Sequence, residues 1–196
     1  MSNASPIIAR FGHADIGHLA AQIEDLAWLA MPVANGLKML SGWRLNKPME
    51  NWVPDDFYSA DGIVADEEAF RAHVEDIAQH RRELAALPRP ETAGNRWMPW
   101  GQSQQSFCYV DGITLHSTAS HGGFHLTPER NLEMCDALRN VDGWYEEDGE
   151  WAKVAETFPD LFTARERKQA SRTLCNDYPD YWEASRVVQL PPGQAS

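Results

Sequence analysis

Two short motifs in the second half of the chain combine residue types that could do chemistry. The first is Ser120-His121-Gly122-Gly123, and the second is Gly143-Trp-Tyr-Glu-Glu-Asp148, which is followed by Glu150. An imidazole titrates near neutral pH, while carboxylates accept protons or bind cations. Together the two motifs could support acid–base catalysis, metal binding or recognition of a charged partner.

The glycine pair predicts a loop that binds an anion. Gly122 and Gly123 lack a Cβ atom, so they can take positive φ and approach another group closely. The free N–H groups of this loop, with those of a helix beginning at Thr127, could hold a carboxylate or a phosphate. Ser120, Gly122 and Gly123 are therefore candidate binding residues. The alternative is that the glycines only reverse the chain and that His121 bonds a backbone carbonyl.

A nucleophilic hydroxyl is one catalytic interpretation of the loop. Ser120 and His121 are neighbours, and neighbours in an extended chain project to opposite sides, so the base would be a different histidine. No Gly-x-Ser-x-Gly elbow supports this interpretation. The candidate nucleophiles and bases are Ser117, Thr118, Ser120, His116 and His125.

Metal binding and acid–base catalysis are the other two interpretations. Three histidines and a carboxylate could hold a metal ion, although the glycine pair interrupts any helical His-x-x-x-His spacing, and we expect neither a metal nor a cofactor. Acid–base catalysis requires only that the chain fold the acidic motif back beside the loop. In that case His121 works with Glu146 or Asp148. The metal ligands would be His116, His121 and His125 with Glu146, Glu147 or Asp148.

The acidic motif is also a candidate recognition surface. Residues 142–160 contain seven acids and one lysine. Aromatic and acidic side chains together suit an arginine-rich partner surface. The candidate binding residues are Trp144, Tyr145, Glu146, Glu147, Asp148 and Glu150. The alternative is that the tryptophans belong to the core and that the acids are only solvated.

Composition limits the class of protein. A chain of 196 residues with 43% apolar residues can bury one sizeable core. Its three cysteines are widely spaced, and no secretory segment or membrane span is apparent, so we expect a soluble cytoplasmic protein. A net charge of −12 disfavours direct binding of nucleic acid, which needs Lys and Arg to neutralise phosphates. The expected partner is a basic protein surface.

The pattern of apolar residues predicts an α+β fold that is mostly helical. A small antiparallel sheet is expected on a β-hairpin that turns at Asp111-Gly112. Helices are predicted to begin near residues 15, 66, 128, 147 and 164. The first rests on helical spacing of Ile16, Leu19, Ala20, Ile23, Leu26 and Ala27.

Two domains are expected on either side of a Pro/Gly-rich segment at residues 88–94. Residues 1–95 form a helical N-terminal part, in which residues 32–62 are ordered but irregular. Residues 96–196 form an α+β domain that carries both motifs.

The second half of the chain resembles a known family. The resemblance rests on Ser120-His121-Gly122-Gly123 and Gly143-Trp-Tyr-Glu-Glu-Asp148, supported by Asn131, Phe158-Pro159 and Pro179-Asp180. These residues resemble a C-terminal domain of unknown function found in proteins of bacterial plasmids and phages. The resemblance implies a mobile-element setting and no established activity.

Two functional hypotheses follow. The first is a non-enzymatic accessory protein of a mobile genetic element. Its acidic surface would bind a basic partner, such as a host-defence nuclease or a nucleic-acid-binding complex. It would thereby act in counter-defence, as anti-restriction or anti-CRISPR proteins do. The second is a small hydrolase or transferase that uses His121 with a carboxylate of Glu146, Glu147 or Asp148.

Overall fold

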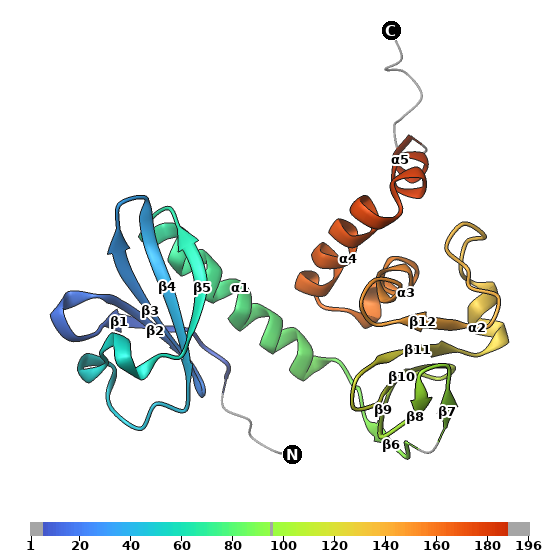
Figure 1. Ribbon diagram of the computed structural model, residues 1–196, viewed down its shortest axis with the longest axis horizontal. Helices are drawn as coiled ribbons and strands as arrows, with labels where there is room; N and C mark the ends of the chain where they lie inside the picture. The colour runs from blue at the N-terminus through green and yellow to red at the C-terminus, as the bar shows by residue number, and fades with distance from the viewer. Residues whose placement is uncertain (1–5, 95, 188–196) are drawn as a thin grey trace, which may run out of the picture. The chain divides into compact units, whose positions relative to one another are not determined.

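The computed structural model describes residues 6–94 and 96–187 (Figure 1). Contacts between residues divide the chain into two compact units, Met1–Glu83 and Leu84–Ser196. The division falls within the long helix α1. Each unit is built around its own five-stranded antiparallel sheet.

The first unit is an antiparallel meander followed by a helix. Each strand pairs with the next along the chain, so the sheet order is β1-β2-β3-β4-β5. Short loops favour this arrangement, because antiparallel neighbours need only a tight turn between them. The elements are β1 (Arg10–His13), β2 (Leu19–Ile23), β3 (Leu26–Val33), β4 (Gly36–Trp43), β5 (Ser59–Val64) and α1 (Glu67–Ala86).

Both faces of this first sheet are covered. On one face, α1 packs Phe70, Val74 and Ala78 against a cluster that includes Trp28. On the other face, the irregular residues 44–58 bury Trp52 against Leu29 and its neighbours. This segment contains two short 3₁₀ turns, η2 (Met49–Asn51) and η3 (Pro54–Asp56).

The predicted helix from Asp15 is wrong, and the N-terminal part is a five-stranded sheet with one long helix, α1, in place of a helical domain. Residues 19–33 form β2 and β3, which pair across a tight turn at Glu24-Asp25. Because the sheet is covered on both faces, these strands bury successive residues and lose the polar–apolar alternation of a half-exposed strand. Their continuous apolar sequence therefore imitates the spacing of an amphipathic helix. Residues 32–62 are irregular only between β4 and β5.

The helix predicted from residue 66 is present as α1. The Asp66 carboxylate accepts a hydrogen bond from the backbone N–H of Ala69 at 2.9 Å, which is an N-cap interaction. Phe70 and Val74 of α1 are fully buried, as the helical spacing predicted.

The second unit begins with a short edge strand and a small hairpin. Its five-stranded sheet has the order β12-β11-β10-β9-β6, and β7 and β8 form a separate two-stranded sheet. The strands are β6 (Glu91–Thr92), β7 (Trp97–Met98), β8 (Gly101–Gln102), β9 (Gln105–Val110), β10 (Ile113–Ser117), β11 (Gly122–Leu126) and β12 (Trp144–Glu146). The helices are α2 (Pro128–Leu132), α3 (Trp151–Thr157), α4 (Ala164–Asp177) and α5 (Pro179–Val187), with the 3₁₀ turn η4 (Pro159–Leu161).

The hairpin predicted at Asp111-Gly112 is confirmed as β9–β10, and Gly112 has the positive φ of 82° that the turn requires. Two of the predicted helix starts, near residues 128 and 164, are also present, and each carries a cap. Thr127 accepts from the N–H of Arg130, and Thr163 forms a capping box with Glu166 at the start of α4. Local turn and cap chemistry is therefore reliable in this unit.

The prediction of a mostly helical fold is wrong, because the structure is 36% helical and 31% strand. In the second unit the missed strands are β6, β7, β8, β11 and β12. The helix predicted from residue 128 ends at Leu132, and the one predicted from residue 147 begins at Trp151. Among the described residues, no helix is long and apolar enough to cross a membrane.

A substitution at Leu29 distinguishes experimentally between the observed sheet and the helix that the sequence predicted. Leu29 lies outside the helical stripe that the sequence predicted, but in the sheet it is fully buried. Leu29→Ala is therefore expected to lower the free energy of unfolding of the first unit by about 2–5 kcal/mol, measured by urea denaturation. Ile63→Ala, at a half-exposed position on β5, is the control and should cost less than about 1 kcal/mol. Equal costs for the two variants would contradict the observed burial.

Candidate functional site

The second sheet presents two chemically different faces. Alternate residues of its strands, such as Ile113, Phe124 and Tyr145, are buried in the core against α3 and α4. The residues between them point to the other face. There the registers bring Ser106, His116, His125 and Trp144 onto neighbouring strands. This polar and aromatic face holds most of the histidine chemistry of the unit.

A buried serine–histidine pair lies on this face. Ser106 Oγ and His116 Nδ1 share a hydrogen bond at 2.8 Å, and Ser103 Oγ lies 3.0 Å from Ser106 Oγ. Ser106 is 0% exposed and His116 is 5% exposed, so a substrate cannot reach the pair. Burial and the nearby Arg96 both lower the pKa of His116, which favours its neutral form. The pair is therefore a structural contact rather than a catalytic dyad.

His125 lies beside it in an aromatic and cationic environment. Its ring centroid is 4.6 Å from that of Trp144, and Arg96 Nη1 lies 3.3 Å from His125 Nδ1. Burial, Arg96 and His116 lower the pKa of His125 to about 4, while Asp142 opposes them. His125 Nδ1 therefore accepts a hydrogen bond from Arg96, and the imidazole stays neutral at physiological pH.

The glycine pair belongs to a strand instead of an anion-binding loop. Gly122 and Gly123 begin β11 and pair with β10 and β12, and neither has positive φ. Their small size has another cause, because a Cβ at Gly123 would lie 2.5 Å from the Trp100 ring, and one at Gly122 would collide with the Glu147 carboxylate. The glycine pair correctly indicated that another group approaches the backbone closely, but it did not indicate that the groups are Trp100 and Glu147.

His121 and the acidic motif do come together. The β10–β11 loop is held by Thr118, whose Oγ1 accepts from the N–H of His121 at 3.1 Å. The N–H of Glu147 donates to the carbonyl of Gly122 at 3.0 Å, which brings the end of β12 beside this loop. As a result, ligand atoms of His121, Glu146 and Glu147 all lie within 4.8 Å of one another.

The other predicted site residues lie around this group or away from it. Asp148 is exposed and donates its N–H to Glu146 Oε2 at 2.7 Å, and Ser120 is exposed in the loop. His116 and His125 are on the polar and aromatic face. In the part of the chain that the structure describes, the residues placed to share a metal ion are His121, Glu146 and Glu147, without His116 or His125.

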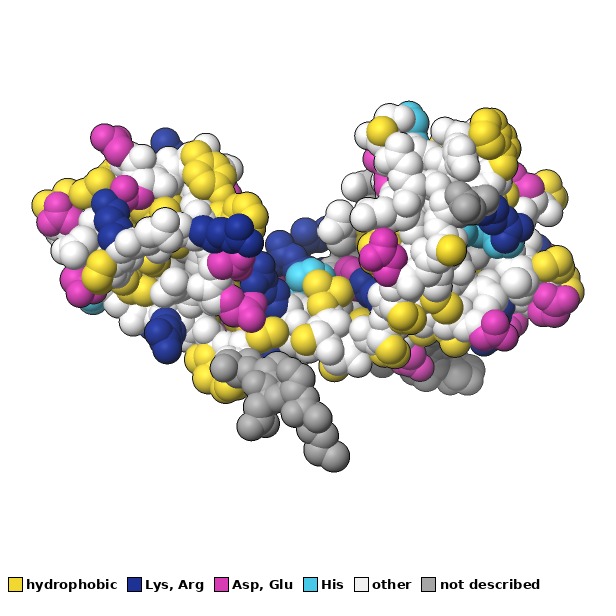
Figure 2. Space-filling model, turned by 90° about the horizontal axis from the view of Figure 1, so that it is seen from below, with side chains coloured by type: hydrophobic (Ala, Val, Ile, Leu, Met, Phe, Trp, Pro, Cys, Tyr) yellow, Lys and Arg dark blue, Asp and Glu magenta, His cyan; other side chains and the backbone are white. Residues whose placement is uncertain are grey.

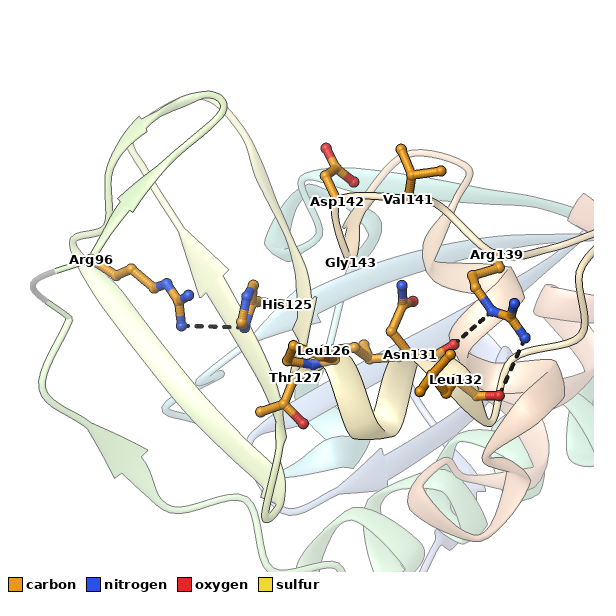
Figure 3. A pocket seen from close by; sticks show the side chains of 11 residues that line it. Arg96, His125, Leu126, Thr127, Asn131, Leu132, Arg139, Val141, Asp142 and Gly143 are labelled. Atoms are coloured by element: carbon orange, nitrogen blue, oxygen red, sulfur yellow. Dashed lines mark hydrogen bonds between the residues drawn. The ribbon is translucent and has the colours of Figure 1, made fainter.

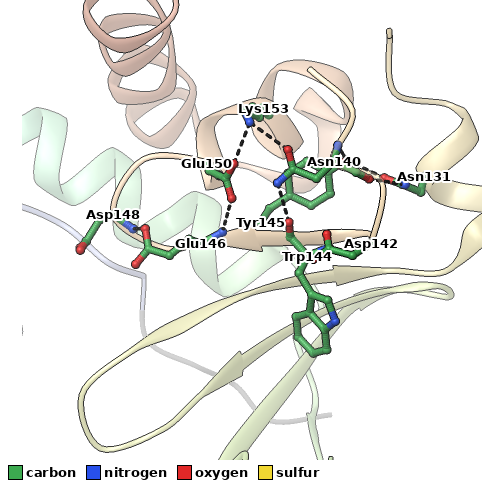
Figure 4. A network of polar contacts seen from close by, with 9 residues as sticks. All are labelled: Asn131, Asn140, Asp142, Trp144, Tyr145, Glu146, Asp148, Glu150 and Lys153. Carbon is green, nitrogen blue, oxygen red and sulfur yellow. Dashed lines mark hydrogen bonds and ion pairs between the residues drawn. The ribbon is translucent and has the colours of Figure 1, made fainter. Parts of the chain in front are cut away.

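A polar network inside the unit fixes the acidic motif (Figure 4). Lys153 is only 6% exposed, and its Nζ donates to Glu150 Oε1 at 2.8 Å and to Asn140 Oδ1 at 3.0 Å. Burial alone would raise the pKa of Glu150, but the hydrogen bonds from Lys153 and Asn140 prevail and lower it. Tyr145 is fully buried and donates to Asn131 Oδ1 at 2.5 Å. Glu150 and Tyr145 are therefore internal contacts of the unit.

A pocket of about 630 Å³ opens between α2 and the segment before β12 (Figure 3). Arg96 and His125 bound one side, Asp142 and Val141 lie above, and Leu132 lies opposite. Leu132 and Val141 are 71% and 102% exposed, and both line this one pocket.

We call the surface around this pocket the 129–142 surface. Its exposed residues are Glu129, Leu132, Glu133, Asp136, Val141 and Asp142. Its two arginines are held within the unit. Arg130 pairs with Glu133, and Arg139 pairs with Asp136 and donates to the carbonyls of residues 131, 132 and 134. The surface therefore combines solvent-exposed apolar groups with an excess of acids.

The acids of the protein do not form one continuous patch on the face in Figure 2. Acidic side chains there are scattered among hydrophobic and basic side chains in both units. Net charge alone therefore does not locate a binding surface on that face. Local combinations of charge and apolar exposure do so better.

Sequence reasoning missed Arg96, Ser106, Leu132 and Val141. Ser106 carried no signal, because the register shifts between Ile113 and Thr114, so His116 lies opposite Ser106 and not opposite Phe107, where the turn at Asp111-Gly112 alone would place it. Leu132 and Val141 carried no signal, since an isolated apolar residue in a sequence predicts burial.

The depressed pKa of His125 makes stability depend on pH. The unfolded chain, with a histidine pKa of about 6.5, binds more protons than the folded chain between pH 6.5 and about 4. Stability contributed by neutral His125 is therefore present above pH 6.5 and lost as pH falls toward 4. His125→Gln should flatten this part of the stability profile, measured as the urea midpoint against pH. Parallel profiles for the wild type and the variant would refute the role of His125.

Comparison with known proteins identifies the second half of the chain. No curated protein matches the chain, and no solved structure matches it either. The model of a family described as a domain of unknown function, DUF7007, matches residues 95–196. This segment contains His121, Glu146, Glu147 and the 129–142 surface. Because the match covers more than half of the chain, the protein belongs to the DUF7007 family.

Proposed function

We propose that the protein is a non-enzymatic binding protein whose C-terminal unit engages a basic protein partner through the 129–142 surface. The observation that carries the proposal is the exposure of Leu132 and Val141 at the mouth of a pocket, among exposed acids. An exposed apolar patch rimmed by polar residues marks an interaction site, and a few central residues contribute most of the binding energy of a protein interface.

The charge of this surface selects the partner. Of its acids, Glu129 and Asp142 form no ion pair in the part of the chain that the structure describes. An approaching Lys or Arg side chain would therefore meet carboxylates that are not already neutralised. The 129–142 surface precedes the acidic motif at residues 143–150 that the sequence indicated. Tyr145 and Glu150 of that motif make contacts inside the unit and are less available to a partner.

Within this proposal the chain is an accessory protein of a mobile genetic element. The resemblance to domains of plasmid and phage proteins supports that setting. The net charge of −12 supports a partner with a basic groove, such as a host-defence nuclease or a nucleic-acid-binding complex. By occupying such a groove, an acidic protein would exclude the nucleic acid.

The test first captures a partner from the host bacterium by pull-down with the wild-type chain. It then compares the affinity of that partner for the wild type and for three variants of the full chain. Leu132→Ser/Val141→Ser removes the apolar anchors, and Glu129→Lys/Glu133→Lys reverses two acids. Each should weaken binding by about tenfold or more, and wild-type affinity should fall as salt is raised. Glu50→Lys/Asp55→Lys changes the net charge equally at exposed positions of the first unit and serves as the control. An equal loss in Glu50→Lys/Asp55→Lys would show that only net charge matters, and full affinity in Leu132→Ser/Val141→Ser would exclude the apolar anchors.

A second candidate function is hydrolysis or group transfer at His121. The observation that favours it is the approach of Glu146 and Glu147 to the imidazole within 4.8 Å, which an acid–base pair requires. None of these three residues lines the pocket of the 129–142 surface.

An activity screen tests this second candidate. With 4-nitrophenyl esters and phosphates as probes, His121→Ala should reduce turnover by about 10²–10⁴-fold, because a positioned acid–base group contributes that much. His13→Ala, at an exposed histidine of the first unit, should keep wild-type turnover. No turnover by the wild-type chain, or full turnover by His121→Ala, would remove the enzymatic candidate.

A further inference from the structure

The group of His121, Glu146 and Glu147 has the composition of a metal site. One imidazole and two carboxylates converge, and their ligand atoms lie within 4.8 Å of one another. An ion that binds such atoms at about 2.0–2.2 Å holds them roughly 3–4 Å apart. Side-chain rotations that move the ligand atoms by about 1 Å would therefore bring all three residues into contact with one ion.

The backbone beneath these side chains is already fixed. Thr118 and His121 close the β10–β11 loop, since the N–H of Thr118 donates to the carbonyl of His121 at 2.7 Å. On the other side, β12 pairs with β11, with Glu146 opposite Gly123. Only side chains would have to move on binding, so little conformational entropy would be lost at that step.

Gly122 provides the room that the carboxylate occupies. A Cβ atom at this position would overlap with Glu147 Oε2. Gly122 has no positive φ, so the glycine reflects close approach by two groups, the carbonyl oxygen of His116, which would lie 2.8 Å from a Cβ, and the Glu147 carboxylate. The strand next to His121 thus leaves space for the side chain that would share an ion with it.

The two carboxylates also lack a positive partner. In the described ranges 6–94 and 96–187, no Lys or Arg pairs with Glu146 or Glu147, although Glu150 nearby is paired with Lys153. Two adjacent negative charges repel unless a cation or a proton lies between them. An imidazole among the ligands favours a transition-metal ion over Mg²⁺ or Ca²⁺, which prefer oxygen ligands alone.

We infer that His121, Glu146 and Glu147 bind one divalent first-row transition-metal ion. With three protein ligands, the remaining coordination positions are open to water, which gives the ion Lewis-acid character. The site is separate from the 129–142 surface and does not depend on the proposed interaction. It differs from the acid–base candidate, because a metal ion and a proton compete for the same imidazole nitrogen.

Metal titration of the full chain tests the inference, with Mn²⁺ followed by electron paramagnetic resonance and Zn²⁺ by calorimetry. The Zn²⁺ arm uses a Cys135→Ser/Cys175→Ser background, because both exposed thiols could bind Zn²⁺. The wild type should bind one ion of either metal per chain at this group. His121→Ala and Glu147→Gln should each weaken binding by at least about tenfold, since even outer-shell changes cost 10–100-fold.

Matched controls separate a built site from an acidic surface. His13→Ala should bind as the wild type does, and circular dichroism should show that His121→Ala keeps its fold. Mg²⁺ should bind more weakly than Mn²⁺ in the wild type. The inference is overturned if the wild type binds neither metal at millimolar concentration. It is equally overturned if His121→Ala retains full affinity, because the ion would then be held by carboxylates alone.

Discussion

A buried ammonium group determines the arrangement of the C-terminal unit. Lys153 on α3 is almost inaccessible to water, and an unpaired charge there would cost several kcal/mol. Its hydrogen bonds to Glu150 and Asn140 satisfy it, so the segments before and after β12 must lie where these partners can reach the amine. Asn140 also binds the carbonyl of Trp144, which connects this requirement directly to β12. Val141 and Glu147 lie just before and just after β12, so the hydrogen bonds of Lys153 help to fix their positions.

The second sheet distributes chemistry by the alternation of its side chains. One set of alternate residues builds the apolar core, and the other set holds neutral histidines among tryptophans and serines. Ser106 and His116 of this face are buried, and burial is the largest cause of the lowered pKa of His116 and of His125. Residues available to partners or ions lie instead where strands end, in the β10–β11 loop and in the turns around β12. Rigid strands with reactive loops at their ends are a common way to position a site.

Local chemistry was predicted well and strand assignment was not. Asp66, Thr127 and Thr163 were recognised as the starts of helices, because a cap depends on residues within one turn of the chain. Strands β2 and β3 were mistaken for a helix, because layers on both faces of their sheet removed the alternation that identifies a strand. Gly122 and Gly123 predict a loop by their type, but they begin β11, where the missing Cβ atoms leave room for Glu147 and Trp100. In each error the missing information was a neighbour distant in the sequence.

The sequence by itself determined the hairpin at Asp111-Gly112, the helix caps and the two motifs that carry imidazole and carboxylates. These depend on backbone preferences and residue types that act over a few positions. Only the tertiary structure decided that His121 meets Glu146 and Glu147 and that Tyr145 is internal. Those outcomes depend on strand order and register, which place β12 beside β11 although more than fifteen residues separate them in the chain. Side chains distant in sequence become neighbours through backbone pairing, which the identity of the side chains themselves does not specify.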